Sequence, residues 1–209
     1  MNIPIAFEDD WLLVADKPSG LLVIPTPKKE SRTLTSILNT HIKEKEGSLR
    51  LHPCHRLDRE TSGLVIYAKG KSIQKKMMDA FKFQRVKKTY IAFVQGVLSQ
   101  NNGRITLPIE QRPSVTSYQV LERRKNFTVV KAWPLTGRTN QIRIHFKSIG
   151  HPLLGESRFA FRRDYELRFK RTCLHAASVE FSHPVTGEKI KIEAELPGDL
   201  LDFLARPYH

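Results

Sequence analysis

Short apolar runs separated by turn residues recur along the whole chain, and this rhythm limits most strongly how the chain can fold. Strands are expected at 3–15 (two strands split by the acidic turn 8–10), 21–24, 64–68, 89–97, 105–107, 117–123, 127–133, 176–181 and 189–194. Helical spacing is clear only at 33–45 and 71–83, and 141–149 is ambiguous. Because helices do not alternate regularly with strands, the pattern predicts one α+β domain over residues 1–209 rather than a β-α-β fold.

The charge balance indicates a polyanionic partner. Lys and Arg number 35 against 21 Asp and Glu, which leaves a net charge of +14 at pH 7. The cations gather at 71–88, which reads as a helix with a basic outer face, and at 158–171, where arginines alternate with aromatic residues. Such clustering favours RNA, although cations that merely solvate the surface remain an alternative. The residues assigned to the RNA backbone are Lys75, Lys76, Lys82, Arg162, Arg163 and Arg168.

Several other classes of protein are disfavoured. No uncharged apolar run is long enough for a bilayer, and the first ten residues carry acids where a secretory signal needs cations, so no membrane partner is expected. Two cysteines, Cys54 and Cys173, cannot build a disulfide framework, which favours the cytoplasm. Their spacing from His52, His55 and His175 does not match structural zinc sites. Phosphate-loop and dinucleotide motifs are absent, so neither a metal nor a nucleotide cofactor is expected.

Residues 55–63 (HRLDRETSG) concentrate functional groups just before an apolar strand. Polar loops at the edge of a rigid sheet are where sites tend to be built. Asp58 lies between Arg56 and Arg59 in sequence, which would favour its ionised form if either cation points at it. From the residues alone, this segment is either a site with a single carboxylate or a turn that an aspartate caps.

Ordered motifs over nearly the whole chain resemble the RluA-type pseudouridine synthase family. Residues 55–63 resemble its HRLDxxTSG signature. Further matches, in chain order, are DKPSGL at 16–21, KTY at 88–90, TGRTNQIRIH at 136–145, GHPLLG at 150–155, LHA at 174–176 and FSHP at 181–184.

The resemblance implies a pseudouridine synthase fold, in which a central, mostly antiparallel mixed sheet with flanking helices carries a catalytic cleft. It also implies an isomerase of the intramolecular transferase type, which converts specific uridines of ribosomal or transfer RNA to pseudouridine. In that reaction the base detaches from C1′ at N1 and reattaches at C5, without cofactor or metal. The base must leave its stack, so base flipping is expected. A monomer is expected, and the target uridine and RNA class are left open.

Single residues inherit roles through these motifs. Asp58 matches the catalytic aspartate, by a chemical route that stays open, and Arg143 matches the arginine that pairs with it. Tyr90 matches the tyrosine that stacks on the flipped uracil and is a candidate proton acceptor. Leu174 matches an apolar contact on the other face of the base, and Arg56 is the candidate wedge. The other predicted substrate contacts are Thr61, Arg138 and Gln141. The rival function is a catalytically idle RNA-binding or RNA-folding module, and the intact catalytic set argues against it.

The chain departs from the family pattern at three places. Asn140 stands where histidine is usual, and an amide cannot take the role of a titrating imidazole. Glu156 replaces the usual aspartate, a change expected to be neutral. Residues 108–118 are shorter than the RNA-gripping loop of many relatives, so target choice is the attribute that this departure is expected to affect most. The helical RNA-binding module of many members is not recognised before the core, so affinity is expected to come from the core itself.

Overall fold

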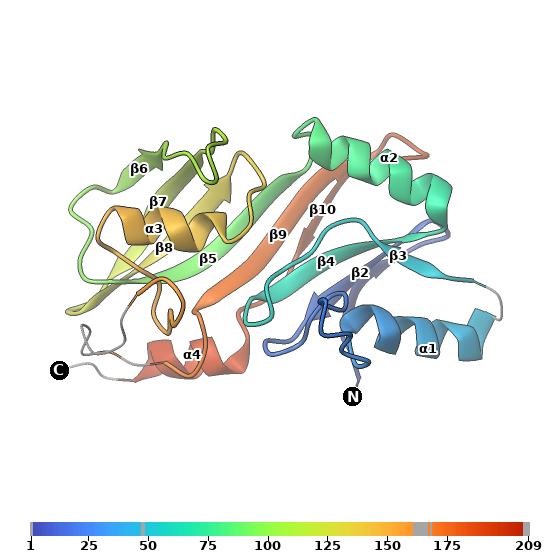
Figure 1. Cartoon of the computed structure of the whole chain (residues 1–209), viewed down its shortest axis with the longest axis horizontal. Helices are drawn as coiled ribbons and strands as arrows, with labels where there is room; N and C mark the ends of the chain where they lie inside the picture. The colour runs from blue at the N-terminus through green and yellow to red at the C-terminus, as the bar shows by residue number, and fades with distance from the viewer. Residues whose placement is uncertain (1, 47–48, 161–166, 168, 207–209) are drawn as a thin grey trace. The chain divides into compact units, whose positions relative to one another are not determined.

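The computed structural model describes residues 2–46, 49–160, 167 and 169–206. Its helices are α1 (Leu34–Glu46), α2 (Lys71–Lys82), α3 (Gln141–Ser148) and α4 (Gly198–Ala205). Its strands are β1 (Ile5–Glu8), β2 (Leu12–Lys17), β3 (Leu51–Pro53), β4 (Ser62–Lys69), β5 (Lys87–Gln95), β6 (Asn102–Ile105), β7 (Thr116–Arg123), β8 (Phe127–Pro134), β9 (Leu174–Ser182) and β10 (Lys189–Glu193). Figure 1 labels these elements along the chain.

The elements form two compact units. Unit 1 contains Met1–Lys87 and Ser178–Glu195, and unit 2 contains Lys88–Ala177 and Leu196–His209. Strand β9 therefore begins in unit 2 and ends in unit 1. The expectation of a single catalytic domain stays a prediction, and each unit is described by itself.

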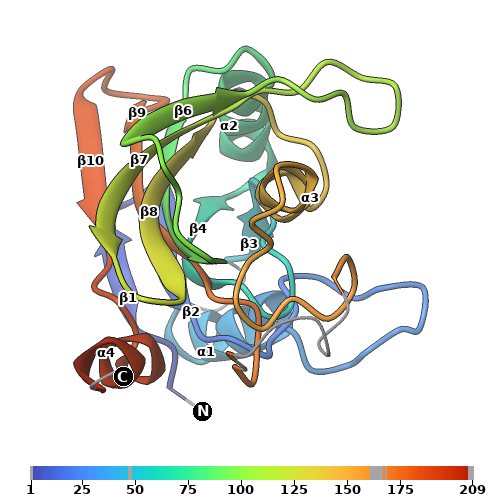
Figure 2. The same cartoon turned by 90° about the vertical axis from the view of Figure 1, so that its left-hand side faces the viewer.

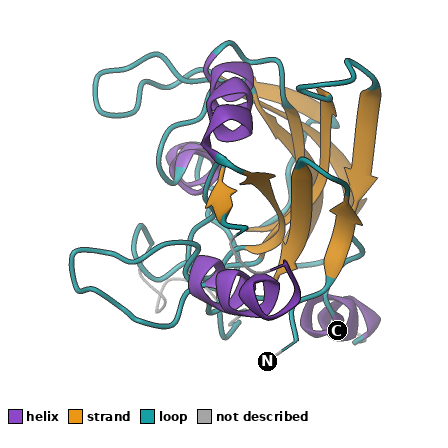
Figure 3. Cartoon of the chain, turned by 90° about the vertical axis from the view of Figure 1, so that its right-hand side faces the viewer, coloured by secondary structure: helices purple, strands orange, loops and turns teal. Residues whose placement is uncertain are grey.

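The sheet of unit 1 has the order β1-β2-β4-β9, with β10 on β9 and β3 on β4. Every pair whose register the structure gives is antiparallel. Leu64 and Ile66 of β4 pack in one apolar cluster with Met77 of α2. Tyr67, the next residue along β4, reaches α1 instead, where its hydroxyl lies 3.0 Å from the Thr35 hydroxyl. Figure 3 shows α1 and α2 beside these strands. The two helices thus hold the strand that follows the 55–63 segment.

The sheet of unit 2 has the order β5-β8-β7-β6, again with antiparallel pairs. Successive residues of a strand point to opposite faces. Ala92 of β5 packs with Ile142 of α3, and its neighbour Phe93 packs with Leu200 and Phe203 of α4. Helices α3 and α4 therefore cover opposite faces of this sheet (Figure 2). The predicted α+β class with a mostly antiparallel sheet is confirmed.

Residues 21–24, predicted to be a strand, are not one. The carbonyl oxygens of Leu22 and Val23 accept hydrogen bonds from the backbone N–H groups of Leu34 (2.7 Å) and Thr35 (3.1 Å) at the start of α1. The run is apolar because it packs against this helix start, with Val23 only 1% exposed. A short apolar run cannot reveal whether a strand or a helix end will cover it.

Three other expectations are settled by the structure. The ambiguous segment 141–149 forms helix α3, because its apolar residues face the sheet of unit 2. The strand expected at 105–107 lies slightly earlier, as β6. Strand β3 and helix α4 were not predicted. The strand has only three residues and the helix only eight, which is too short for a clear apolar periodicity. Among the described residues, no helix combines the length and apolar character needed to cross a bilayer.

Candidate active site

A buried lysine organises the turn that supports the 55–63 segment. Lys17, at the end of β2, is 0% exposed. Its ammonium donates hydrogen bonds to the backbone oxygens of Leu21 (2.8 Å), Pro18 (3.0 Å) and Arg59 (3.1 Å). A buried ammonium is tolerated only when such acceptors surround it. Lys17 therefore ties the 17–21 turn to the backbone directly after Asp58.

The same turn adds two further bonds to this backbone. The hydroxyl of Ser19 donates to the oxygen of Glu60 at 2.8 Å, and the N–H of Gly20 donates to the oxygen of Arg59 at 2.8 Å. Gly20 has a φ of +86°, a conformation that suits glycine. The two residues that follow Asp58 are thus held by donors from a segment about forty positions earlier.

Asp58 itself is half-buried at the start of a tight turn. Its backbone oxygen accepts a hydrogen bond from the N–H of Thr61 at 3.2 Å. Thr61 is 2% exposed, whereas Arg56 is exposed to solvent. Next in the chain, Gly63 pairs with Lys17 between β4 and β2. The structure thus brings Asp58 onto a loop whose backbone is fixed directly after this residue.

His55 anchors the start of this loop. Its Nε2 accepts a hydrogen bond from the backbone N–H of Ile66 at 3.0 Å, and its ring lies 4.7 Å from the Phe81 ring. A ring nitrogen that accepts carries no proton, so the neutral tautomer has its proton on Nδ1. This support for the loop was not anticipated from the sequence.

In unit 2, Arg143 of α3 forms a two-pronged ion pair with Glu156. Nε donates to Oε2 at 2.7 Å and Nη2 donates to Oε1 at 2.8 Å, with side chains that are 9% and 1% exposed. Nη1 donates to Oδ1 of Asn140 at 2.8 Å. This fork geometry is specific to arginine and fixes the plane of the guanidinium group. Glu156, expected to be a neutral replacement, is thus a defined partner of Arg143.

The carboxylate of Glu156 is stabilised from several directions. Burial alone would raise its pKa, but the hydrogen bonds and charge of Arg143 and the N–H groups of Arg158 and Phe159 bring the pKa below its ordinary value. The Phe159 ring also lies 5.2 Å from the guanidinium carbon of Arg143 and 5.3 Å from that of Arg158. Arg143 is therefore held by an ion pair on its edge and by an aromatic ring.

Backbone geometry places Glu156 and Asn140. Gly155 has a φ of +74°, and a Cβ there would lie 1.8 Å from the backbone oxygen of Arg171, so only glycine fits. Asn140 caps α3 in the left-handed region, at φ 54° and ψ 23°, which asparagine tolerates better than most residues. Its side-chain oxygen then accepts from Arg143. The departure from histidine at this position therefore supplies an acceptor here.

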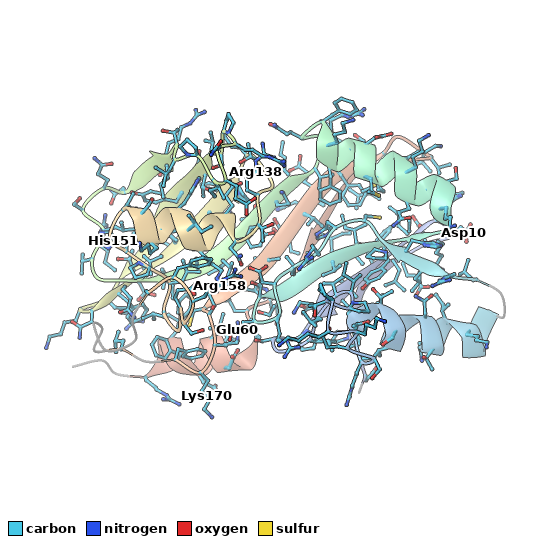
Figure 4. All side chains as sticks on the ribbon, viewed as in Figure 1. Asp10, Glu60, Arg138, His151, Arg158 and Lys170 are labelled. Carbon is cyan, nitrogen blue, oxygen red and sulfur yellow. The ribbon has the colours of Figure 1, made fainter. Side chains whose placement is uncertain are left out.

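Gln141 and Arg138 differ in how open they are to a ligand. Gln141 is 4% exposed, and its amide bonds Thr136, the N–H of Arg138, the oxygen of Val115 and the hydroxyl of Thr116. With both its hydrogens and its oxygen engaged, Gln141 supports this loop, and its contact with the substrate stays a prediction. Arg138 (Figure 4) is half-buried, and its Nε is buried without a hydrogen-bond partner among the described residues.

Tyr90 and Leu174 share one apolar cluster of unit 2. Tyr90, on β5 opposite Ala132, is half-buried, and Leu174, the first residue of β9, is 4% exposed. Both pack with Ile142 of α3, the neighbour of Arg143. The structure therefore brings the predicted tyrosine, leucine and arginine positions onto adjoining elements of unit 2.

The predicted RNA-backbone residues are described only in part. Lys75, Lys76 and Lys82 are exposed on and at the end of α2. The other predicted backbone contacts, Arg162, Arg163 and Arg168, lie outside the described residues. Within the described ranges, no group of three or more His, Cys, Asp or Glu is arranged to hold a metal ion. Cys54 is buried, which raises the pKa of its thiol to about 12.

Comparisons with known proteins agree with these motifs. A family model described as RNA pseudouridylate synthase matches residues 11–148. The dual-specificity RNA pseudouridine synthase RluA of Haemophilus influenzae is 35% identical, with 92% of this chain and 93% of that protein covered. The uncharacterized RNA pseudouridine synthase YlyB of Bacillus subtilis is 34% identical, with 98% of this chain and 72% of that protein covered. The solved structure of human RNA pseudouridylate synthase domain containing 4 has a TM-score of 0.82 at 24% identity, covers 96% of this chain and 91% of that one, and shows the same fold.

Proposed function

This chain belongs to the RNA pseudouridylate synthase family, and from that premise we propose how its residues carry the reaction. The protein is an isomerase that converts uridine in RNA to pseudouridine. We propose that Asp58 is its catalytic carboxylate. The observation that carries this assignment is the set of hydrogen bonds from the 17–21 turn to the backbone directly after Asp58, which supports a fixed position for this residue within the segment that the family model matches.

The chemistry requires few groups. The bond between C1′ and N1 breaks, a bond between C1′ and C5 forms, and a proton leaves C5 while N1 gains one. Asp58 acts on the nucleoside as a nucleophile or as an acid–base group, and in either role a carboxylate held at a fixed position is what the step needs. Tyr90 stacks on the flipped uracil and accepts the C5 proton, and Leu174 contacts the base from the other side. Their shared apolar cluster supports these roles.

The role proposed for Arg143 is the one that its motif implies, that of the arginine whose positive charge favours an ionised catalytic carboxylate. Support comes from its guanidinium plane, which Glu156 and Asn140 hold before any RNA arrives, so the charge is already oriented. Arg56 acts as the wedge that fills the gap left by the flipped base, in keeping with its exposed side chain. Arg138 contributes a contact to the RNA, in keeping with its partly exposed side chain.

The substrate is ribosomal or transfer RNA. One relative is named a dual-specificity RNA pseudouridine synthase. Another, which is 36% identical, is named a ribosomal large subunit pseudouridine synthase. The exposed lysines of α2 bind phosphates and set affinity rather than sequence choice. The protein works as a monomer in the cytoplasm, where its two buried free cysteines suit a reducing environment.

Mapping pseudouridine across total RNA from cells with and without this protein tests the function. One or a few uridines should lose the modification without the protein and regain it when the wild-type gene is returned. The purified protein should convert the same uridine in a transcript. Identical maps, together with RNA binding but no conversion, would instead favour the idle RNA-binding module.

A further inference from the structure

An aromatic ring stands in solvent at the end of the basic helix. Phe83, the residue after α2, is 60% exposed, more than any other large apolar side chain in the described part of the chain. The ammonium of Lys82 lies 5.6 Å from the ring centre and the guanidinium carbon of Arg85 lies 5.4 Å from it. Both distances fall within the range of cation–π attraction. An isolated exposed apolar residue needs no explanation, but an exposed ring with two cations within cation–π range is a distinct surface feature.

The backbone around this ring is fixed. The N–H of Arg85 donates to the oxygen of Ala80 at 2.8 Å, and the N–H of Gln84 donates to the oxygen of Phe81 at 3.1 Å. This pair of bonds is the Schellman arrangement that ends many helices. It requires a left-handed residue, and here Gln84 takes that role with a φ of 57°.

Core contacts on both sides prevent the ring from turning inward. Phe81 packs against the apolar cluster of unit 1, and Val86 is part of that cluster and only 5% exposed. The chain between these two anchors leaves Phe83 outside. The exposure of the ring is therefore set by the helix end and by the core, rather than by a mobile segment.

The surroundings of the ring suit a nucleic acid. Helix α2 presents Lys75 and Lys76 on its exposed side, and Asp79 is its single acidic residue. A positive stripe that ends in an aromatic ring combines the two features by which proteins bind unpaired nucleotides. A membrane or an acidic protein would use the charge but would not require a planar ring.

We propose that Phe83 is a stacking platform for an unpaired base of the substrate RNA, with Lys82 and Arg85 binding the adjoining phosphates. The choice of RNA as the partner rests on the proposed function. In the complex the base covers one face of the ring, and the cation that it displaces contacts a phosphate of the same strand. The platform therefore favours targets with a single-stranded nucleotide near the modified uridine.

Binding of the full chain to a single-stranded oligouridylate of about 12 nucleotides and to an RNA duplex of similar length tests this proposal. Phe83→Leu should weaken binding to the single strand by about fivefold to tenfold, the lower end expected for losing one stacked base. Phe83→Tyr should restore it, because a phenol ring stacks equally well. The matched control is Met78→Ala, which removes another exposed apolar side chain of α2 (53% exposed) and should change little.

Salt dependence separates stacking from charge. Lys82→Gln should lower the slope of log affinity against log salt by about 0.7, whereas Phe83→Leu should leave the slope unchanged. The platform would be overturned if Phe83→Leu bound the single strand as tightly as the wild type, or if it lost as much affinity for the duplex as for the single strand. An effect confined to binding of another protein would overturn it as well. Failure of the wild-type protein to form pseudouridine would count against the proposed function alone, because these binding measurements need no turnover.

Discussion

Helix α3 carries Arg143 on its buried side, in a fork with Glu156, whereas helix α2 carries its lysines on an exposed side. The buried cation has named partners at fixed distances, so removing one partner leaves an uncompensated charge. The exposed lysines are solvated by water and salt ions, so replacing any one of them leaves no uncompensated buried charge. Buried charges in this protein therefore define geometry, and we assign the exposed charges to affinity for a polyanion.

The segment around Asp58 is likewise held in place by a buried charge. Lys17 is fully buried, and its ammonium donates hydrogen bonds to the backbone oxygens of Pro18, Leu21 and Arg59. Its function in unit 1 parallels that of Glu156 in unit 2, because each holds in place a residue to which we assign chemistry. The predictions below test this division, from the largest expected effect to the smallest.

Replacing Asp58 by Asn should abolish turnover while RNA affinity stays within a few-fold. The change keeps the shape of the side chain but removes its charge, and loss of a positioned acid–base group alone costs about 10²–10⁴-fold in rate. Single-turnover conversion of a uridine-containing transcript measures it. The control is Asp10→Asn, which removes an exposed carboxylate from the turn after β1 (Figure 4) and should leave the rate unchanged. Substantial conversion of uridine by Asp58→Asn would show that Asp58 is not the catalytic carboxylate.

Breaking the Arg143–Glu156 pair should reduce both stability and activity. Glu156→Gln or Arg143→Ala leaves one buried charge uncompensated, which costs about 3–5 kcal/mol when the partner is fully buried. Arg143→Lys should recover the charge but not the fork, and so only part of the rate. Urea unfolding and single-turnover rates measure the two effects.

The exposed ion pair between Lys87 and Glu180 (3.0 Å) is the matched control for the buried pair. Glu180→Gln should lower the free energy of unfolding by less than about 1 kcal/mol, as is usual for pairs in solvent. Similar losses for Glu156→Gln and Glu180→Gln would erase the distinction between buried and exposed charges.

Acid should remove the contribution of Glu156. Its pKa in the folded protein is below the ordinary value of 4.5, so the carboxylate stabilises the fold fully above that value. This contribution is lost as the pH falls through the folded pKa, because the unfolded chain then binds the proton more readily. The difference in unfolding free energy between wild type and Glu156→Gln should be constant from about pH 7 to pH 5 and shrink below about pH 4.5. His145, whose pKa burial lowers, titrates in both proteins and cancels in the difference. A gap that stayed constant down to about pH 3 would contradict the assignment.

Neutralising the exposed lysines should have the smallest structural effect. Changing Lys75, Lys76 and Lys82 together to Gln should reduce the salt slope by about 2 on any RNA, since each phosphate contact contributes about 0.7–0.9. The modified position and the rate at saturating RNA should stay the same, and the free energy of unfolding should change by less than about 0.5 kcal/mol. Titrations at several salt concentrations measure the slope. An unchanged slope would mean that these lysines only solvate the surface.

Local patterns in the sequence determined much of this protein. The periodicity of apolar residues located most strands and the helices at 34–46 and 71–82. Each element must bury one face, and the spacing of its apolar residues shows which face that is. Ordered motifs identified Asp58, Tyr90 and Arg143 as residues to which chemistry is assigned. Both kinds of signal are readable because they lie within a few consecutive residues.

Only the tertiary structure decided how these residues are held. The bond from Lys17 to the backbone of Arg59 spans 42 positions, and the fork between Arg143 and Glu156 spans 13. Nothing near Glu156 in the sequence indicates its partner, and the run at 21–24 looked like a strand because its cover, the start of α1, was not visible. Periodicity tells which face of a segment is buried, but which surface buries it is a property of the folded chain. Partners far apart in sequence become neighbours only when the sheets form, so the supports of the assigned residues could not be read beforehand.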